Sequence, residues 1–453
     1  MNENIILAGL LSKSQLINLI EILSSPSRLL FSRLHLGYPQ NPFESQTCFA
    51  QHPELFIMSS TITEALEEFT DQSSAVAPIS VDEFQNRIAR LRAMMKQNEI
   101  DAVYLHGGTN LYYFTGLQWN PSERMVAAIV PAEGEIIYIA PQFELGTVKD
   151  YWLIESRLET WEEHQSPFEL ASKLLNEIGC SAGTLGVDET TPFVFVDGLS
   201  RTLPNAKLIS AKSLTEGCRQ RKSENEIAII RQAHKMTLQV IKSAASILRP
   251  GISTSEVAKY IDDAHRAIGA SNGSYFCIVL FGVSTSFPHG VKNAQILGEE
   301  DWVLIDTGFQ LNGYHSDITR TFPFGSATER QAEIWNLERQ AQLAAFDAAQ
   351  IGNPCEAIDA AARTVLENAG LGPDYSLPGL PHRTGHGCGL DIHESPYVVR
   401  GNSEPLEKGM VASIEPMIVM PDEFGVRLED HFFMTETGPE WFTEPARSID
   451  DCF

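Results

Sequence analysis

Two β-type runs joined by Asn312-Gly313, in the stretch DWVLIDTGFQLNGYHSDITRTF, constrain the fold of this chain most strongly. An Asn-Gly pair between apolar runs is the strongest short-range signal for a two-residue β-hairpin. If these two residues form the centre of the turn, Leu311 pairs with Tyr314. The sequence therefore predicts an antiparallel strand pair with a fixed register.

Two aspartates lie in this hairpin. The register places Asp306 opposite Thr319 and Gly308 opposite Asp317, so the two carboxylates emerge on one face as diagonal neighbours, within reach of a shared cation. The hairpin alone would also fit a solvated face, where aspartates are common. The apolar residues around Asp306 favour the cation, because burying unpaired aspartates among them is costly; these are Val303, Ile305 and Phe309.

A second predicted hairpin, MVASIEPMIVMPDEFGVRLEDHFFMTETG, carries Glu415 in one β-type run and Glu429 in the next, across a loop with Pro421, Asp422 and Gly425. Both glutamates lie among apolar residues. Four such carboxylates and one imidazole would form an oxygen-rich site for a pair of divalent manganese, cobalt, iron or zinc ions. The lack of thiolates in the set favours the harder ions.

The stretch RTGHGCGLDIHESP supplies the candidate imidazole. Its glycines at 385, 387 and 389 are expected to let the backbone approach closely and to permit positive φ angles. His386 is the best candidate ligand, and His382 and His393 would flank the metals. A single histidine is more often structural, but three within twelve residues beside these carboxylates indicate a site.

Composition limits the possible functions. With 453 residues, 43% hydrophobic and 20% charged, the chain is long enough for two globular domains. A net charge of -26 disfavours nucleic acid and anionic membranes as partners. The seven scattered cysteines lack CxxC spacing, and no apolar run is long enough to span a membrane, so we expect a cytoplasmic protein.

Three regions differ in pattern. Residues 1–79 show no sustained helical or strand period and are expected to be a poorly ordered extension. Because Met58 would be a natural start of the protein, residues 1–57 could be an over-extended reading frame. Residues 80–215 alternate helical and β-type runs, as an α/β domain does. Residues 216–453 begin with two capped helices and continue with hairpins, which is typical of an α+β domain.

The candidate ligands resemble those of the metallopeptidases with the pita-bread fold, which include methionine aminopeptidase, aminopeptidase P and prolidase. The match covers all five metal-ligand positions of that family: Asp306, Asp317, His386, Glu415 and Glu429. Residues 80–215, including TNLYYFTG, resemble the N-terminal domain of the creatinase, prolidase and aminopeptidase P branch. The resemblance implies a creatinase-like α/β domain followed by a pita-bread catalytic domain; methionine aminopeptidases lack the former.

The resemblance also implies roles for other residues. His289 in FPHG would line the substrate pocket, and His382 and His393 would stabilise the substrate or an intermediate. Arg427 in GVRLED would hold the carboxylates, and Glu415 would also shuttle the proton.

The implied activity is hydrolysis of Xaa-Pro bonds at peptide N-termini by a hydroxide that bridges two divalent metal ions, Mn²⁺ first, with Co²⁺, Zn²⁺ or Fe²⁺ as alternatives. The expected partners are a proline-containing peptide as substrate and further copies of the chain, in a homodimer or higher oligomer.

Several alternatives share the fold. Creatinase-like enzymes and the binding modules of histone-chaperone type lack the ligands, and dimethylsulfoniopropionate lyases carry a second aspartate where this chain has Gly308. Amide hydrolases of small molecules, such as ectoine hydrolase, keep the metal ligands, so the ligands alone do not exclude this activity.

The choice between dipeptidase and aminopeptidase also stays open. A dipeptidase should bind the substrate's C-terminal carboxylate with an arginine. Some prolidases have that arginine just after HExP, where this chain has Tyr397; Arg400 or Arg383 could substitute.

Overall fold

The computed structural model describes residues 62–453, which all belong to one compact unit. The predictions for residues 1–57, and for the rest of the extension up to residue 61, lie outside the described residues. Residues 62–79 are packed: Ile62, Leu66 and Phe69 contact the hydrophobic core, and the Gln72 N–H donates to the Ile268 carbonyl at 2.8 Å. A short 3-10 helix, η1 (Ser73–Ala75), precedes the first strand.

The N-terminal half contains a six-stranded sheet with the order β4-β3-β2-β1-β5-β6. The pairs β1–β2 and β2–β3 are antiparallel and the remaining pairs are parallel. The strands are β1 (Ala102–His106), β2 (Ala127–Pro131), β3 (Ile137–Pro141), β4 (Arg157–Trp161), β5 (Thr184–Val187) and β6 (Lys207–Ser210).

Helices cover both faces of this sheet, as the alternation along β1 requires. Val103 and Leu105 join the core beneath α3, whereas Ala102 and Tyr104 join the core beneath α6 and α7. The helices and one further 3-10 turn are α3 (Val81–Gln97), α4 (Thr109–Thr115), η2 (Gln142–Glu144), α5 (Leu145–Tyr151), α6 (Pro167–Glu177), α7 (Phe193–Thr202) and α8 (Lys212–Arg219).

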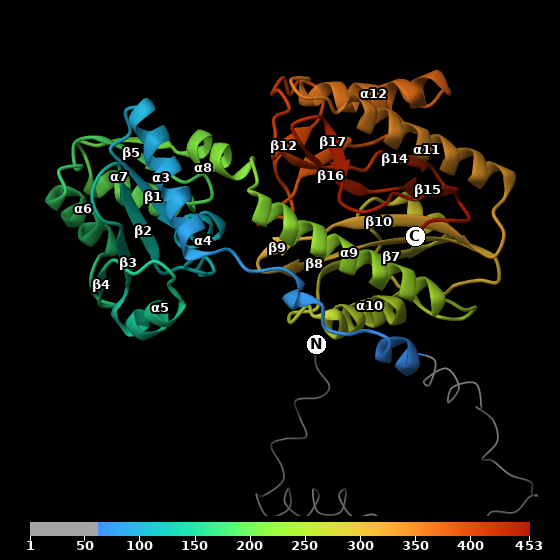
Figure 1. The fold of residues 1–453 in the computed structure, drawn as a ribbon, viewed down its shortest axis with the longest axis horizontal. Helices are drawn as coiled ribbons and strands as arrows, with labels where there is room; N and C mark the ends of the chain where they lie inside the picture. Colours follow the sequence, from blue (N-terminus) through green and yellow to red (C-terminus); the bar gives the residue numbers. More distant parts are fainter. Residues whose placement is uncertain (1–61) are drawn as a thin grey trace, which may run out of the picture. The chain divides into compact units, whose positions relative to one another are not determined.

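The second half begins with the two predicted helices, α9 (Glu224–Ser246) and α10 (Thr254–Ile268), and each starts with a complete capping box. They lie along one side of the sheet β10-β8-β7, which is visible in Figure 1. Its parts are β7 (Ser274–Phe281), η3 (Gly282–Ser286), β8 (Asp301–Leu311), β9 (Tyr314–His315) and β10 (Ile318–Phe324).

A second set of strands follows the helices α11 (Glu329–Ala348) and α12 (Cys355–Asn368), which pack against it. These two helices lie on the side away from α9 and α10 in Figure 1. The strands are β11 (Gly385–Gly387), β12 (Glu394–Val398), β13 (Val411–Ile414), β14 (Met417–Met420), β15 (Phe424–Arg427), β16 (Asp430–Met434) and β17 (Pro439–Trp441). The two layers of strands are therefore enclosed between two pairs of helices.

The register predicted from Asn312-Gly313 is confirmed. Leu311 pairs with Tyr314, and Asp306 pairs with Thr319. Between β9 and β10 the ladder opens at residues 316 and 317, which belong to no strand. Asp317 therefore lies at a short break in its strand, not within a continuous ladder.

The second hairpin differs from the prediction. Glu415 and Glu429 were placed in two strands, but each lies just outside a strand end, so the hairpin consists of four strands. The ladders β13–β16 and β14–β15 separate at the two glutamates because their backbones pair elsewhere: Glu415 N–H donates to Thr384 O at 2.8 Å, and Glu429 N–H to Thr319 O at 3.1 Å. Both breaks face the first hairpin and the histidine segment.

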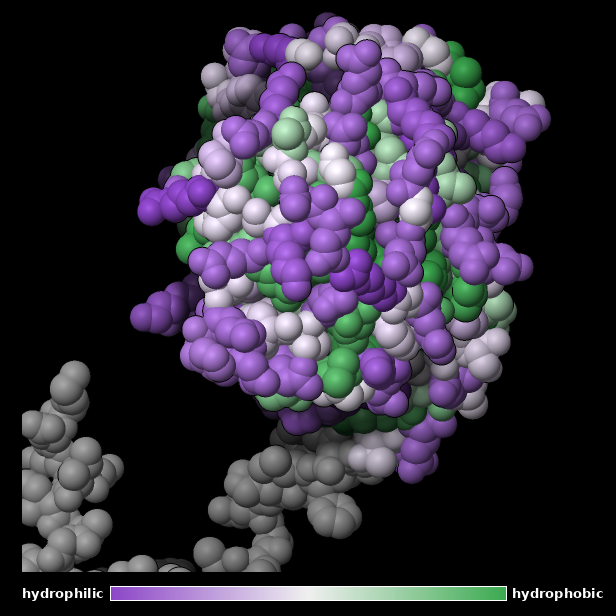
Figure 2. Space-filling model, turned by 90° about the vertical axis from the view of Figure 1, so that its left-hand side faces the viewer, coloured by the Kyte–Doolittle hydropathy of each residue, from purple (hydrophilic) through white to green (hydrophobic). Residues whose placement is uncertain are grey.

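The face of the molecule in Figure 2 is covered mostly by hydrophilic side chains, with hydrophobic residues visible in narrow areas between them. Among residues 62–453, no helix has both the length and the apolar composition needed to cross a bilayer.

Candidate metal centre

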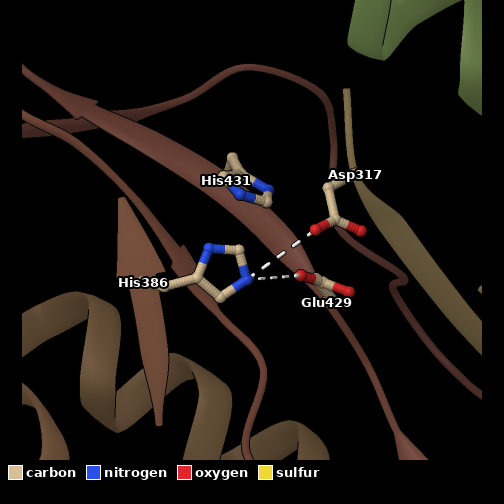
Figure 3. Close-up of side chains that lie close together, drawn as sticks. All are labelled: Asp317, His386, Glu429 and His431. Carbon is tan, nitrogen blue, oxygen red and sulfur yellow. Dashed lines mark ion pairs between the residues drawn. The ribbon is translucent and has the colours of Figure 1, made fainter. Parts of the chain in front are cut away.

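Three of the five predicted ligands converge at the strand breaks. The His386 Nε2 atom lies 3.7 Å from Asp317 Oδ2 and 4.0 Å from Glu429 Oε1. Figure 3 shows the three side chains pointing toward one another, with the ion pairs drawn as dashed lines. All three side chains are buried, so a cation bound here would be shielded from solvent.

Glu415 completes the surroundings of the same imidazole. Its Oε1 atom lies 3.0 Å from His386 Nε2 and accepts a hydrogen bond from the Ser413 hydroxyl at 3.2 Å. The His386 Nδ1–H donates to the Gly387 carbonyl at 3.0 Å, which turns Nε2 toward the carboxylates. A metal-binding histidine needs this arrangement, with its second nitrogen held by a backbone oxygen, and would give up any Nε2 proton when a metal binds.

Asp306 is bound by Arg427, whose Nη2 atom forms an ion pair with Asp306 Oδ2. The same guanidinium donates from Nε to the Thr319 hydroxyl at 3.1 Å and from Nη1 to the Pro288 carbonyl at 3.0 Å. Thr319 in turn donates to Glu429 Oε2 at 2.7 Å. Arg427 therefore connects Asp306 and Glu429 to the loop that carries His289.

The electrostatics of this cluster call for a cation. Burial and the neighbouring carboxylates raise the pKa of Asp317 and of Glu429 well above their usual values. Burial also raises the pKa of Asp306, although Arg427 opposes the shift. Burial would raise the pKa of Glu415 too, but His386 outweighs it and lowers that pKa to about 2. Divalent cations would neutralise this mutual repulsion.

The residues present fit a divalent metal pair. Asp306 Oδ1 and Glu429 Oε1 are buried and have no hydrogen-bond partner among the described residues, which is costly for carboxylate oxygens unless a cation binds them. The donors are four carboxylates and one imidazole, with no thiolate among them. Such a set accepts manganese, cobalt, iron or zinc.

One further candidate donor was missed by the sequence analysis. His431 lies two residues after Glu429 on β16, and its ring nitrogen lies within 4.8 Å of ligand atoms of Asp317, His386 and Glu429 (Figure 3). Neither ring nitrogen of His431 has a hydrogen-bond partner in the described part of the chain. The two-residue period of a strand would have signalled that His431 shares the face of Glu429.

A cavity of about 770 Å³ opens beside the cluster. It is lined by all of the residues for which the sequence analysis predicted a catalytic role, together with His386: His289, His382, His386, His393, Glu415 and Arg427. The structure thus brings the predicted catalytic residues to one place, next to the candidate ligands.

Two of these histidines are neutral near pH 7. Burial lowers the pKa of His382. His393 is exposed, but desolvation by the protein around its ring and the nearby His386 lower its pKa to about 4. The His382 Nδ1–H donates to the Arg383 carbonyl at 2.7 Å, so Nε2 is left as an acceptor. Each ring can therefore exchange hydrogen bonds with a substrate without carrying a charge.

The glycines around His386 serve close packing. A Cβ at Gly385 would lie 2.0 Å from the Ser413 carbonyl oxygen, and one at Gly387 would lie 2.5 Å from the Ser395 carbonyl oxygen. The expected positive φ angles were wrong, because none of the glycines 385, 387 and 389 adopts one. The segment is extended, and the absence of side chains lets neighbouring backbones contact it directly.

Gly308 is constrained in the same way. A Cβ at this position would lie 1.8 Å from the Ser316 carbonyl oxygen, at the break in the ladder beside Asp317. The backbone therefore leaves no room for the second aspartate of the lyases.

A buried ion-pair network holds the segment that follows His393. Glu394 pairs with Lys222 at 2.5 Å and with Arg219, which also pairs with Asp391 at 2.6 Å. Burial would raise the pKa of Glu394, but Arg219 and Lys222 outweigh it and lower the pKa to about 2. The network fixes the segment between β11 and β12 to the end of α8 and to the residues that lead into α9.

Comparison with known proteins identifies the family. Residues 228–436 match the model of metallopeptidase family M24, and residues 87–221 match that of the creatinase/prolidase N-terminal domain. YkvY of Bacillus subtilis, provisionally named a dipeptidase, is 33% identical over 366 residues, which cover 80% of this chain and 99% of YkvY. The chain belongs to metallopeptidase family M24.

Solved structures agree with this M24 assignment. Dipeptidase PepE from Mycobacterium ulcerans superposes with a TM-score of 0.75 at 29% identity and covers 82% of this chain and 98% of PepE. The prolidase from Pyrococcus horikoshii gives a TM-score of 0.70 at 29% identity, over 79% of this chain and 98% of the prolidase. The predicted fold, a creatinase-like domain followed by the M24 pita-bread domain, is confirmed.

Proposed function

We propose that this M24 metallopeptidase binds two divalent metal ions and hydrolyses Xaa-Pro bonds at the N-termini of short peptides. The observation that carries the proposal is the position of the carboxylate cluster, with its unpartnered buried oxygens, beside a cavity lined by His289, His382 and His393. Asp306, Asp317, His386, Glu415 and Glu429 would hold the ions, and Mn²⁺ is the first candidate. When bound, such ions supply a nucleophilic water at neutral pH and polarise the scissile carbonyl.

The chain's own residues would perform the remaining steps. Glu415, whose carboxylate lines the cavity, would accept a proton from the attacking water and pass it to the leaving imino nitrogen. His393 and His289 would donate hydrogen bonds to the substrate and to the developing oxyanion. Arg427 would keep Asp306 in place through its three hydrogen bonds.

The cavity wall supports a proline-containing substrate. Phe287, Pro288 and Pro381 give it an apolar side, against which a pyrrolidine ring can pack. The nitrogen of the Xaa-Pro bond belongs to proline and carries no hydrogen, so an Xaa-Pro bond needs no hydrogen-bond acceptor at that nitrogen, whereas an ordinary peptide bond does. The similarity to the Pyrococcus horikoshii prolidase points the same way.

The test measures metal content and activity on one sample. Elemental analysis of the purified protein is followed by assays with added manganese on Gly-Pro, Ala-Pro and a longer Xaa-Pro peptide. We expect about two ions per chain and hydrolysis of at least the dipeptides. Bound metal without cleavage of any Xaa-Pro substrate would contradict the substrate class and favour the small-molecule amide hydrolase. A protein that binds no divalent ion would contradict the proposal as a whole.

A further inference from the structure

Arg383 is placed at the cavity and has no ionic partner. Its side chain lines the cavity together with His382 and His393, and its charge helps to lower the pKa of His393. The guanidinium carbon lies 4.4 Å from the centre of the Tyr397 ring. Tyr397 is the cross-strand partner of His386, so the stack ties Arg383 to the strands that carry a predicted ligand.

The lack of a partner sets Arg383 apart. All other arginines in residues 62–453 donate to a carboxylate or to a carbonyl oxygen. For the Arg383 side chain the structure shows neither a hydrogen bond nor an ion pair within residues 62–453. Even the arginines without a carboxylate partner, such as Arg92 and Arg249, donate to a backbone carbonyl, so Arg383 differs from them in having neither kind of acceptor.

The geometry suits a carboxylate ligand. The contact with the Tyr397 ring holds the guanidinium in place, and no described residue accepts from its N–H groups, which match the two oxygens of a carboxylate. The other two arginines that could bind a substrate carboxylate already have acidic partners. Arg427 binds Asp306, and the exposed Arg400 pairs with Asp374 and does not line the cavity. Arg383 is therefore the one cavity arginine available to a substrate.

We infer that Arg383, held by Tyr397, binds the C-terminal carboxylate of the substrate, so that the enzyme is a dipeptidase. The inference rests on the proposed function and deepens it. In a dipeptide the terminal carboxylate lies one residue beyond the scissile bond, whereas a longer peptide presents an uncharged amide there. Arg383 thus selects substrate length by charge, from a position other than that of the arginine after HExP in some prolidases.

The experiment compares Ala-Pro with Ala-Pro-amide, which differ only in the terminal charge. The manganese-loaded enzyme and the variants Arg383→Gln, Arg383→Lys and Arg400→Gln are assayed on both. We expect the unaltered enzyme to prefer Ala-Pro by about 100-fold in kcat/KM, as loss of a charge-assisted bidentate pair implies. Arg383→Gln should lower kcat/KM for Ala-Pro by a similar factor, mainly through KM, and leave the amide and the metal content unchanged.

The variants separate the possible outcomes. Arg383→Lys should keep only part of the preference, because an ammonium cannot bind both oxygens at once. Arg400→Gln, the matched control, should behave like the unaltered enzyme. Equal hydrolysis of Ala-Pro and its amide by the unaltered enzyme, or an equal loss on both in Arg383→Gln, would overturn the inference alone. Failure of the metal-loaded enzyme on every Xaa-Pro substrate would overturn the proposed function and the inference with it.

Discussion

At the scale of single residues, Asp317 is the most informative position. Its carboxylate lies 3.7 Å from His386 Nε2, is buried, and occupies the break in the first hairpin. We expect Asp317→Asn to abolish peptide hydrolysis and metal loading, because an amide is a poor ligand for divalent ions beside three carboxylates. Circular dichroism should show a folded protein, since removing one of several mutually repelling carboxylates does not weaken the apo fold.

A matched control is available in the second hairpin. Asp422 is exposed at the turn between β14 and β15 and has φ of 62°, a conformation that asparagine tolerates. Asp422→Asn should therefore keep full activity and metal content. Normal hydrolysis by the Asp317→Asn variant would contradict the assignment of this residue as a ligand.

Gly308 gives a second prediction at this scale. An added Cβ would lie 1.8 Å from the Ser316 carbonyl, so Gly308→Ala must displace the backbone beside Asp317. We expect a loss of about 3 kcal/mol in the free energy of unfolding, measured by urea denaturation, together with weaker metal binding. Gly146→Ala, where nothing lies within 4 Å of the added Cβ, should leave both unchanged or stabilise α5 slightly. Equal stabilities of the two variants would show that the chain at Ser316 relaxes freely.

At the scale of elements, the segment between β11 and β12 depends on Glu394. The folded-state pKa of Glu394 is about 2, below its usual value of 4.5, so the stabilisation by Arg219 and Lys222 is fully present above pH 4.5 and is lost as the pH falls toward 2. Glu394→Gln should therefore unfold more easily near neutral pH, by about 3 kcal/mol, and this deficit should shrink in acid.

Urea denaturation of both proteins at several pH values measures that difference. The matched control is Glu407→Gln, because Glu407 forms an exposed ion pair with Arg221 at 2.7 Å. Exposed pairs contribute less than about 1 kcal/mol, so this variant should resemble the unaltered protein at every pH. A deficit in Glu394→Gln that did not change with pH would mean that packing, and not charge, makes Glu394 important.

The elements also show where sequence reasoning succeeds. The hairpin at Asn312-Gly313 and helices α9 and α10 were predicted because their signals are local: a turn type that fixes register, and capping boxes that fix a helix start. Helix α4 was missed because it has seven residues and no side chain caps its N-terminus.

In the candidate site, too, the features with a local sequence signal could be predicted and those that depend on distant residues could not. Its carboxylates and histidines could be predicted as a set because carboxylates among apolar residues are costly without a cation. The strand breaks at Glu415 and Glu429 could not be predicted from the sequence. They depend on backbone hydrogen bonds to Thr384 and Thr319, which are far away in the sequence. The pairing of Glu394 with Arg219 and Lys222 is equally remote, across about 170 residues of chain.

At the scale of the whole molecule, metal binding should contribute to stability. The candidate ligands come from both layers of strands, so ions bound between them would join the two hairpins and relieve the repulsion among buried carboxylates. We expect the protein treated with a chelator to melt at a lower temperature, and each tenfold rise in free Mn²⁺ above the dissociation constant to add about 1.4 kcal/mol per site.

Differential scanning calorimetry over a range of Mn²⁺ concentrations measures this effect. The Asp317→Asn variant serves as the control, because its melting temperature should not respond to the metal. A melting temperature of the unaltered protein that was independent of Mn²⁺ would contradict the proposed metal centre, whatever the activity assays showed.

The close contact at Gly308 also bears on how this enzyme could change its chemistry over evolutionary time. A hydrolase that gained an aspartate two positions after Asp306 would take a step toward the lyases of the same fold. In this chain a side chain at position 308 would collide with the Ser316 carbonyl, so the first mutation would damage the fold before it could supply a new ligand. A rearrangement around Ser316 would have to come first, and a single-step path to the lyase ligand set is closed.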